Sequence, residues 1–152
     1  MARNHDPYDL NRFVEAQAAN YDDALAELRA GRKRTHWSWY VFPQIRGLGS
    51  SAMSLRYAIG SLAEAVAYIE HAVLGPRLRE SVASLNAHRG LRVNDVLGDI
   101  DAQKFRSCLT LFAQAAPSEP VFKEALNKYF GGDLDAATLA ILAKQQSGKN
   151  EG

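Results

Sequence analysis

Apolar residues recur three or four positions apart between residues 10 and 28, which is the spacing of one face of an α-helix. The positions that follow this period are Leu10, Phe13, Val14, Tyr21, Ala24, Leu25 and Leu28. We expect two consecutive helices, because Asn20 and Asp23 can form a capping box that starts the second one. Gly31 is a typical stop signal. Gln17 interrupts the apolar face. Its buried amide either makes a structural hydrogen bond from the helix to a loop or contacts a ligand.

Five further helices are expected, each with a start or stop signal. Their predicted ranges are residues 61–71, 76–88, 99–114, 119–130 and 135–144. Ser61 and Pro76 can open the first two, and Gly131 can end the fourth. Residues 37–42 form a solidly apolar run, in which periodicity cannot separate a buried strand from a helix. Because one strand makes no sheet, we predict an all-α fold, a compact single-domain bundle of about six to eight helices with irregular connections.

The composition agrees with one globular domain. The chain has 152 residues, 47% of them hydrophobic, and no Pro/Ser-rich linker divides it. We expect an N-terminal extension at residues 1–8, a helical domain at 9–144 and a flexible tail at 145–152. The net charge of +1 creates no global field toward nucleic acid or an anionic membrane, so neither partner is expected. The sequence identifies no protein partner.

The single cysteine, Cys108, excludes an intramolecular disulfide. It falls on the apolar face of the 99–114 helix, where a thiol is expected to be inert. The start of the chain lacks the apolar run of a signal peptide, and no stretch approaches the roughly 18 apolar residues of a membrane helix. We therefore expect a soluble, cytoplasmic protein. No spacing of His, Cys and Asp indicates a metal site, and no cofactor is expected.

Residues 36–44 hold both tryptophans of the chain between a histidine and a glutamine. His36 is the strongest acid/base candidate, because an imidazole beside indole rings can be tuned across neutrality. Trp37 and Trp39 can stack on a flat ligand, or they can be core residues. Gln44 follows Pro43 and can bind an amide or hydroxyl, or make only a turn hydrogen bond. The stretch is either the wall of a pocket or part of the core.

Basic and glycine residues lie on both sides of this aromatic stretch. Arg46, Gly47, Gly49, Ser50 and Ser51 make a turn whose backbone N–H groups can face a phosphate, although an ordinary turn before a helix has the same composition. The basic run at residues 29–34 is either a set of helix C-terminal cations or a local nucleic-acid patch. Lys33 is singled out by its closeness to His36.

Asp101 and Lys104 fall within the apolar face of the 99–114 helix, together with Ile100 and Phe105. They form either an ion pair at the rim of the core or part of a cleft in which their pKa values are tuned for catalysis. His71 ends the 61–71 helix, where a C-terminal cation is the structural alternative to a ligand contact.

Several of these positions recur as motifs that resemble the bacterial domain-of-unknown-function family 1810, whose members are often labelled calpastatin-like. The motifs are Gly31-x-Lys33-x-x-His36-Trp37, Phe42-Pro43-Gln44, Gly47-Leu48-Gly49-x-Ser51, His71-x-x-Leu74-Gly75-x-Arg77-Leu78 and Asp101-x-x-Lys104-x-x-Ser107. The resemblance implies a compact all-helical domain without a settled activity, cofactor or catalytic set. It adds Arg77 to the candidate ligand contacts. Ser38 departs from the family pattern, which favours a bulkier apolar residue there, and Ala72 replaces a frequent proline.

The leading hypothesis is a pocket for a small anionic, nucleotide- or ADP-ribose-like ligand. Lys33, Arg46 and the glycine turn would hold phosphate, and His36 with Asp101 and Lys104 would transfer protons in a hydrolysis. The alternative is a non-catalytic helical module that binds a protein partner. That module would have an exposed apolar patch and no polar cavity beside His36.

Overall fold

The computed structural model describes residues 6–151, with side chains up to residue 147. Within that range the chain forms nine helices, three of which have only four or five residues. In chain order they are α1 (Asn11–Ala30), α2 (Ser38–Val41), α3 (Ala52–Arg56), α4 (Leu62–Glu70), α5 (Leu74–Asn86), α6 (Val93–Leu97), α7 (Asp99–Ala115), α8 (Pro120–Phe130) and α9 (Ala136–Glu151). The described residues form no strand, and one parallel bridge joins Ile45 to Ile59. The predicted all-α class is confirmed.

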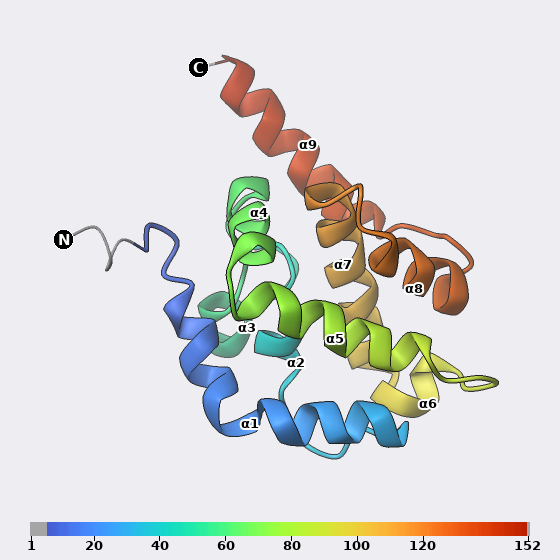
Figure 1. The fold of residues 1–152 in the computed structure, drawn as a ribbon. Coiled ribbons are helices and arrows are strands. Elements are labelled where there is room, and N and C mark those ends of the chain that lie inside the picture. The colour runs from blue at the N-terminus through green and yellow to red at the C-terminus, as the bar shows by residue number, and fades with distance from the viewer. Residues whose placement is uncertain (1–5, 152) are drawn as a thin grey trace.

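Helix α7 lies at the centre of the bundle, and α9 projects from it toward the C-terminus (Figure 1). Phe105, Cys108 and Phe112 of α7 are fully buried. The ring of Phe105 packs on Phe42 at a centroid distance of 4.7 Å, and Phe112 packs on Tyr68 at 5.3 Å. Aromatic pairs at these distances add to the apolar burial. Packing therefore holds α7 from Ala102 onward, and its first turn extends from this fixed part of the helix.

Helix α1 is continuous, so the expected new start at Asn20 is wrong. Asn20 is exposed, and its side-chain amide donates to the carbonyl of Ala16 at 3.3 Å instead of capping a second helix. The buried face runs on from Phe13 to Leu28 although the helix axis bends midway (Figure 1). Gly31 ends the helix as predicted, with a φ of 78° that favours glycine.

The apolar run at residues 37–42 forms the short helix α2 rather than a strand. Trp37, Val41 and Phe42 are each no more than 2% exposed. Their apolar area drives this burial, and no neighbouring strand among the described residues offers a ladder of hydrogen bonds. The run is therefore part of the core, except for Trp39, which is only half-buried.

Helix α4 begins after Ser61, whose hydroxyl caps it as predicted. Helix α5 begins at Leu74, two residues before the expected start at Pro76. Gly75 lies in the first turn of α5, where a Cβ atom would be 2.1 Å from the carbonyl oxygen of Ile69. This contact is too short for any side chain, so the close approach of α4 and α5 requires glycine.

The later part of the chain contains one helix that the sequence did not predict, α6, which Gly98 joins to α7 with a φ of 86°. Helix α9 continues to Glu151, beyond its expected end at residue 144, since no proline follows to interrupt its backbone hydrogen bonds. Among residues 6–151, no helix has the length and hydrophobicity needed to span a bilayer. The domain limits at residues 9 and 144 stay predictions.

Candidate functional site

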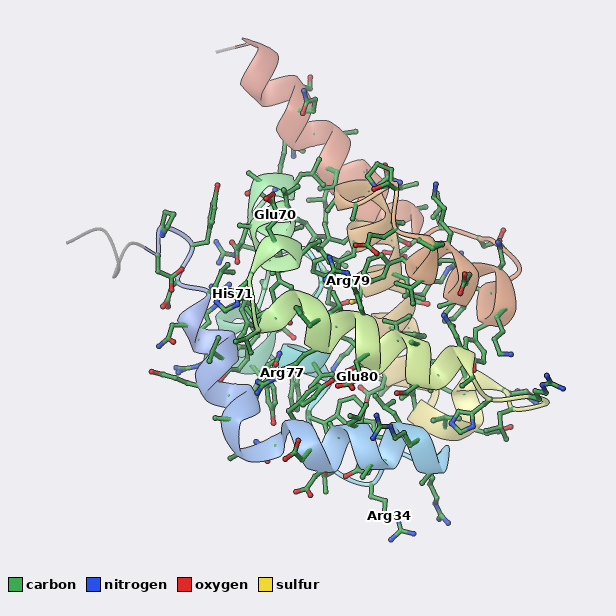
Figure 2. All side chains as sticks on the ribbon, in the orientation of Figure 1. Arg34, Glu70, His71, Arg77, Arg79 and Glu80 are labelled. Carbon is green, nitrogen blue, oxygen red and sulfur yellow. The ribbon has the colours of Figure 1, made fainter. Side chains whose placement is uncertain are left out.

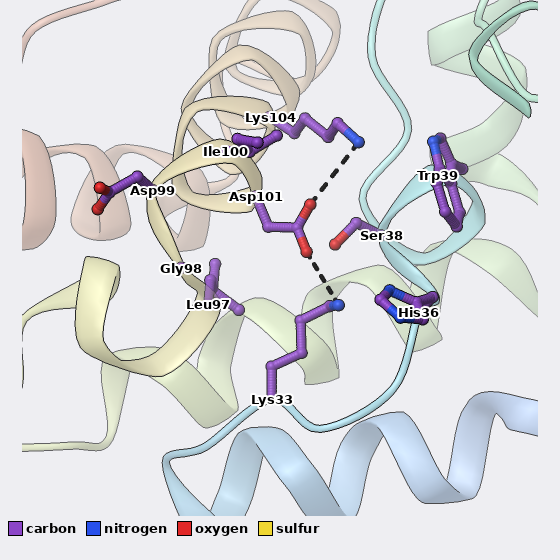
Figure 3. Close-up of a pocket in the computed structure, with 10 residues that line it drawn as sticks. All are labelled: Lys33, His36, Ser38, Trp39, Leu97, Gly98, Asp99, Ile100, Asp101 and Lys104. Carbon is purple, nitrogen blue, oxygen red and sulfur yellow. Dashed lines mark ion pairs between the residues drawn. The ribbon is translucent and has the colours of Figure 1, made fainter. Parts of the chain in front are cut away.

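A cleft of about 540 Å³ opens between the start of α7 and the segment that joins α1 to α2 (Figure 3). Residues 33–39 supply one wall, and residues 97–104 supply the other. The backbone N–H of Lys33 donates to the carbonyl of Val96 at 2.8 Å, which ties the first wall to α6. The two walls are therefore held together by a main-chain hydrogen bond as well as by side chains.

Three charged side chains meet in this cleft. Lys33 Nζ lies 2.9 Å from Asp101 Oδ2, and Lys104 Nζ lies 3.7 Å from Asp101 Oδ1 (Figure 3). The side chains are 7% exposed for Lys33, 19% for Asp101 and 21% for Lys104, and charges so far removed from water must be paired. Asp99 points away from the cluster and accepts a hydrogen bond from Asn94. Two ammonium groups thus converge on one carboxylate.

Each of these ammonium groups also faces an indole ring. Lys33 Nζ lies 5.1 Å from the ring centroid of Trp37, and Lys104 Nζ lies 4.9 Å from that of Trp39. Trp37 is only 1% exposed and packs on Phe42, which supports the alternative that it is a core residue. Trp39 is half-buried and lines the cleft. It is the indole that a ligand can reach.

Glu27, which the sequence pattern does not single out, anchors the wall at residues 34–37. Its carboxylate accepts the backbone N–H groups of Arg34 and Thr35, the hydroxyl of Thr35 and the indole N–H of Trp37, at 2.7 to 3.0 Å. Partial burial alone raises the pKa of Glu27, but these hydrogen bonds outweigh it and lower the pKa from 4.5 to about 2. One ionised carboxylate therefore fixes the loop that presents His36.

The ring of His36 lies at the side of the cleft and is exposed (Figure 3). Within the part of the chain whose side chains are described, neither of its ring nitrogens has a hydrogen-bond partner. A general base is usually oriented by a second group, so His36 is accessible but not held in a catalytic orientation. Ser38, which the sequence prediction did not include, is 3% exposed and also lines the cleft.

A second hollow of about 470 Å³ adjoins the cleft, and Asp99, Ile100 and Lys104 line both. Gln44 and Gly49, two of the predicted binding residues, line the second hollow. Ile100 is 76% exposed at the shared rim, so its expected place on the buried face of α7 is wrong. The first turn of α7 extends beyond the core, which leaves this apolar residue without a covering neighbour.

Three predicted binding residues, Gln17, His71 and Arg77, are not among those that line the cleft. His71 and Arg77 lie around the start of α5, on the side of α1 (Figure 2). Gln17 is 2% exposed and donates to the carbonyl of Tyr40 at 2.7 Å, and Arg77 donates to the Gln17 side-chain oxygen at 3.4 Å. His71 Nδ1 accepts the backbone N–H of Leu74 at 3.2 Å, which caps α5. These contacts support the structural alternative for Gln17 and His71, and they give Arg77 a similar role.

The predicted glycine-rich turn does not face the cleft as one unit. Arg46 lines a separate hollow of about 380 Å³ beside Arg12. Gly47 adopts a φ of 111°, as a tight turn requires, and Ser50 is exposed. The hydroxyl of Ser51 caps the short helix α3. This arrangement supports the alternative of an ordinary turn before a helix.

Cys108 is fully buried, as predicted, and burial raises the pKa of its thiol well above the usual value. Within the described side chains, no three His, Cys, Asp or Glu residues are arranged to hold a metal ion.

The fold and the cleft define a small all-helical protein with a charged and aromatic recess at the start of its central helix. Residues 7–142 match the model of the family described as Protein of unknown function (DUF1810), and the chain belongs to this family. The chain is similar to a solved structure, that of the conserved hypothetical protein Rv1873 from Mycobacterium tuberculosis. The two are 51% identical, the similarity covers 91% of this chain and 99% of that one, and the TM-score is 0.90. No curated protein matches this chain.

Proposed function

We propose that the protein binds a small anionic molecule, of the nucleotide- or ADP-ribose-like class, in the cleft at the start of α7. The observation that carries this proposal is the convergence of Lys33 and Lys104 on one carboxylate, Asp101, within a recess of about 540 Å³. Each ammonium has three N–H donors, and Asp101 uses only part of this capacity. An oxyanion in the recess would accept hydrogen bonds from the N–H groups that the carboxylate leaves free.

The size and lining of the cleft support a small organic ligand. Pockets for such ligands are typically about 300–1,000 Å³ in volume and combine apolar walls with a few polar groups. Trp39 is half-buried in the wall and offers an apolar ring against which a base or sugar can pack. The exposed Ile100 adds apolar surface at the rim.

Hydrolysis of the ligand, with proton transfer by His36 and Asp101, is a narrower form of the same proposal. Binding has more support than catalysis, because both oxygens of Asp101 face a lysine and His36 lacks an orienting partner among the described side chains. The alternative of a protein-interaction module has less support, since it requires the absence of a polar cavity beside His36, and the cleft lies there. A reducing compartment, in keeping with a single buried thiol, remains part of the proposal.

The proposal is tested by thermal unfolding of the protein with inorganic phosphate, AMP or ADP-ribose, and with uncharged adenosine for comparison. A ligand at about 100 times its dissociation constant stabilises the folded state by roughly 2.7 kcal/mol, which is a shift of about 5–11 °C for a domain of this size. Lys104→Met removes one ammonium and keeps most of the side-chain stem, so the shift should be largely lost.

Lys128→Met is the matched control. Lys128 Nζ also lies over an aromatic ring, 5.8 Å from the centroid of Tyr129, but it is exposed and not among the residues that line the cleft. It should keep the full ligand response. Equal shifts in the two lysine variants, or a response to adenosine alone, would exclude anion binding by this cleft.

A further inference from the structure

Ser38 is a buried side chain whose hydroxyl has no hydrogen-bond partner within the described chain. The residue is 3% exposed. The other buried Ser and Thr residues among the described side chains, Ser81, Ser107, Thr110 and Thr138, each have a partner at normal distance. A buried hydroxyl without a partner destabilises the folded state, because it has given up its hydrogen bonds to water. Ser38 is therefore the exception that needs an explanation.

The local structure explains why the Ser38 hydroxyl finds no hydrogen-bond acceptor in its own helix. A serine or threonine inside a helix usually donates to the carbonyl four residues earlier. Ser81 and Thr110 do so, to the carbonyls of Arg77 and Arg106, at 2.8 and 2.9 Å. Ser38 is the first residue of α2, so no preceding helical turn supplies that carbonyl. The cleft that it lines is the place where a bound group can supply this partner.

The surroundings of Ser38 indicate the chemical class of that partner. Ser38 lines the same cleft as Asp101 and the two lysines, and its hydroxyl points toward Asp101 (Figure 3). Each carboxylate oxygen of Asp101 faces a lysine, Oδ2 toward Lys33 and Oδ1 toward Lys104. A group that the ammonium groups attract is negatively charged, and its oxygens are strong acceptors for a hydroxyl. The other buried unpartnered side-chain atom of the described residues, Asn86 Oδ1, belongs to α5 and is not in this lining.

We infer that Ser38 Oγ donates a hydrogen bond to the anionic group of the ligand, which must accept the hydroxyl and an ammonium together. A phosphate monoester meets this requirement. The inference rests on the proposed function and adds a binding residue and a ligand chemistry to it. Ser38 binds the ligand directly and is assigned no proton transfer.

The first test needs no ligand, because it compares the thermal stability of two serine-to-alanine variants. Ser38→Ala removes a hydroxyl without an internal partner, so its Tm should be unchanged or higher. Ser107→Ala is the matched control, since Ser107 is equally buried and donates to Asp135 at 3.0 Å. Its Tm should fall by roughly 3–8 °C. A fall of the same size in Ser38→Ala would mean that the hydroxyl has an internal partner, and it would overturn the inference.

The second test measures the affinity of wild-type protein, Ser38→Ala and Lys104→Met for inorganic phosphate and for AMP by NMR titration. Loss of one hydrogen bond to a charged acceptor should weaken binding in Ser38→Ala about tenfold or more. If Ser38→Ala binds as tightly as wild-type protein while Lys104→Met does not, the inference is wrong and the proposed function stands. If wild-type protein binds neither probe, the inference is wrong, and the proposed function is wrong as well if the protein also fails to bind ADP-ribose.

Discussion

Replacing Glu27 with alanine tests how the wall of the cleft is held. The Glu27 carboxylate accepts four hydrogen bonds, two of them from the backbone of Arg34 and Thr35. A third comes from the Thr35 hydroxyl and a fourth from the indole of the buried Trp37. Alanine leaves all four donors without this acceptor. The loop donors can turn to water, but the Trp37 N–H has less access to solvent, so its desolvation cost remains.

The magnitude follows from the pKa of Glu27, which is lowered from 4.5 to about 2. Each pKa unit corresponds to about 1.4 kcal/mol, so the shift corresponds to about 3 kcal/mol before solvent screening. Glu27 is only partly buried, and screening reduces this to about 1–2 kcal/mol. We expect Glu27→Gln, which keeps one acceptor oxygen, to lower the free energy of unfolding by about 1–2 kcal/mol. Glu27→Ala should cost about 2–4 kcal/mol, because it also loses the remaining acceptor.

The same shift predicts a dependence on pH. The pKa of Glu27 is lower in the folded state than in the unfolded state, so its contribution to stability is complete above about pH 4.5 and is lost as the pH falls toward 2. Glutamine does not titrate. The difference in unfolding free energy between wild-type protein and Glu27→Gln should therefore be constant near neutrality and shrink between about pH 4.5 and pH 2.

The assay is urea denaturation followed by tryptophan fluorescence, at about pH 7 and at about pH 3. Glu15→Ala is the control, because Glu15 is an exposed α1 glutamate with one side-chain hydrogen bond, from Asn11 at 2.8 Å. It should change stability by no more than about 0.5 kcal/mol. The reasoning fails if Glu27→Ala costs no more than this control. It also fails if the difference between wild-type protein and Glu27→Gln does not change with pH.

Two further predictions concern the core. Gly75→Ala places a methyl group where a Cβ atom would lie 2.1 Å from the Ile69 carbonyl oxygen, so it should lower the unfolding free energy by more than about 3 kcal/mol, measured by circular dichroism. A melting curve like that of wild-type protein would refute the close packing of α4 on α5. Cys108 should react with iodoacetamide only as fast as the protein unfolds, since its thiol is buried and its pKa is raised. Rapid labelling of the native protein, followed by mass spectrometry, would contradict this burial.

The sequence predicts the longer helices because their signals are local. A capping serine at Ser61 and a left-handed glycine at Gly131 mark boundaries of α4 and α8 without reference to any distant residue. The short helices α2, α3 and α6 are too brief for a periodic pattern to form. Asn20 is a local signal that misleads, since the apolar face of α1 continues past it and packing decides the outcome.

The site residues also differ in whether a local sequence signal marks them. Asp101 and Lys104 are visible in the sequence because both interrupt the apolar face of a single helix. Lys33 has no such signal, since it belongs to a basic run at a helix end, and only the fold brings it to Asp101 across 68 positions of sequence. The two tryptophans are two residues apart, yet only Trp39 reaches the cleft. The turn of α2 directs their side chains to different environments, which composition cannot reveal.

The two lysines have different roles, and this decides which of them tests the proposed function. Lys33 joins the loop after α1 to Asp101 at 2.9 Å, so it also holds the cleft together, and breaking such a desolvated pair is costly. Lys104 lies 3.7 Å from Asp101 on the same helix, and an i,i+3 pair of this kind contributes only about 0.2–0.5 kcal/mol. We therefore expect Lys104→Met to change stability little, although the side chain is only 21% exposed, because Asp101 keeps its ion pair with Lys33. Loss of ligand response with unchanged stability in Lys104→Met would therefore separate binding from folding, which no Lys33 variant can do.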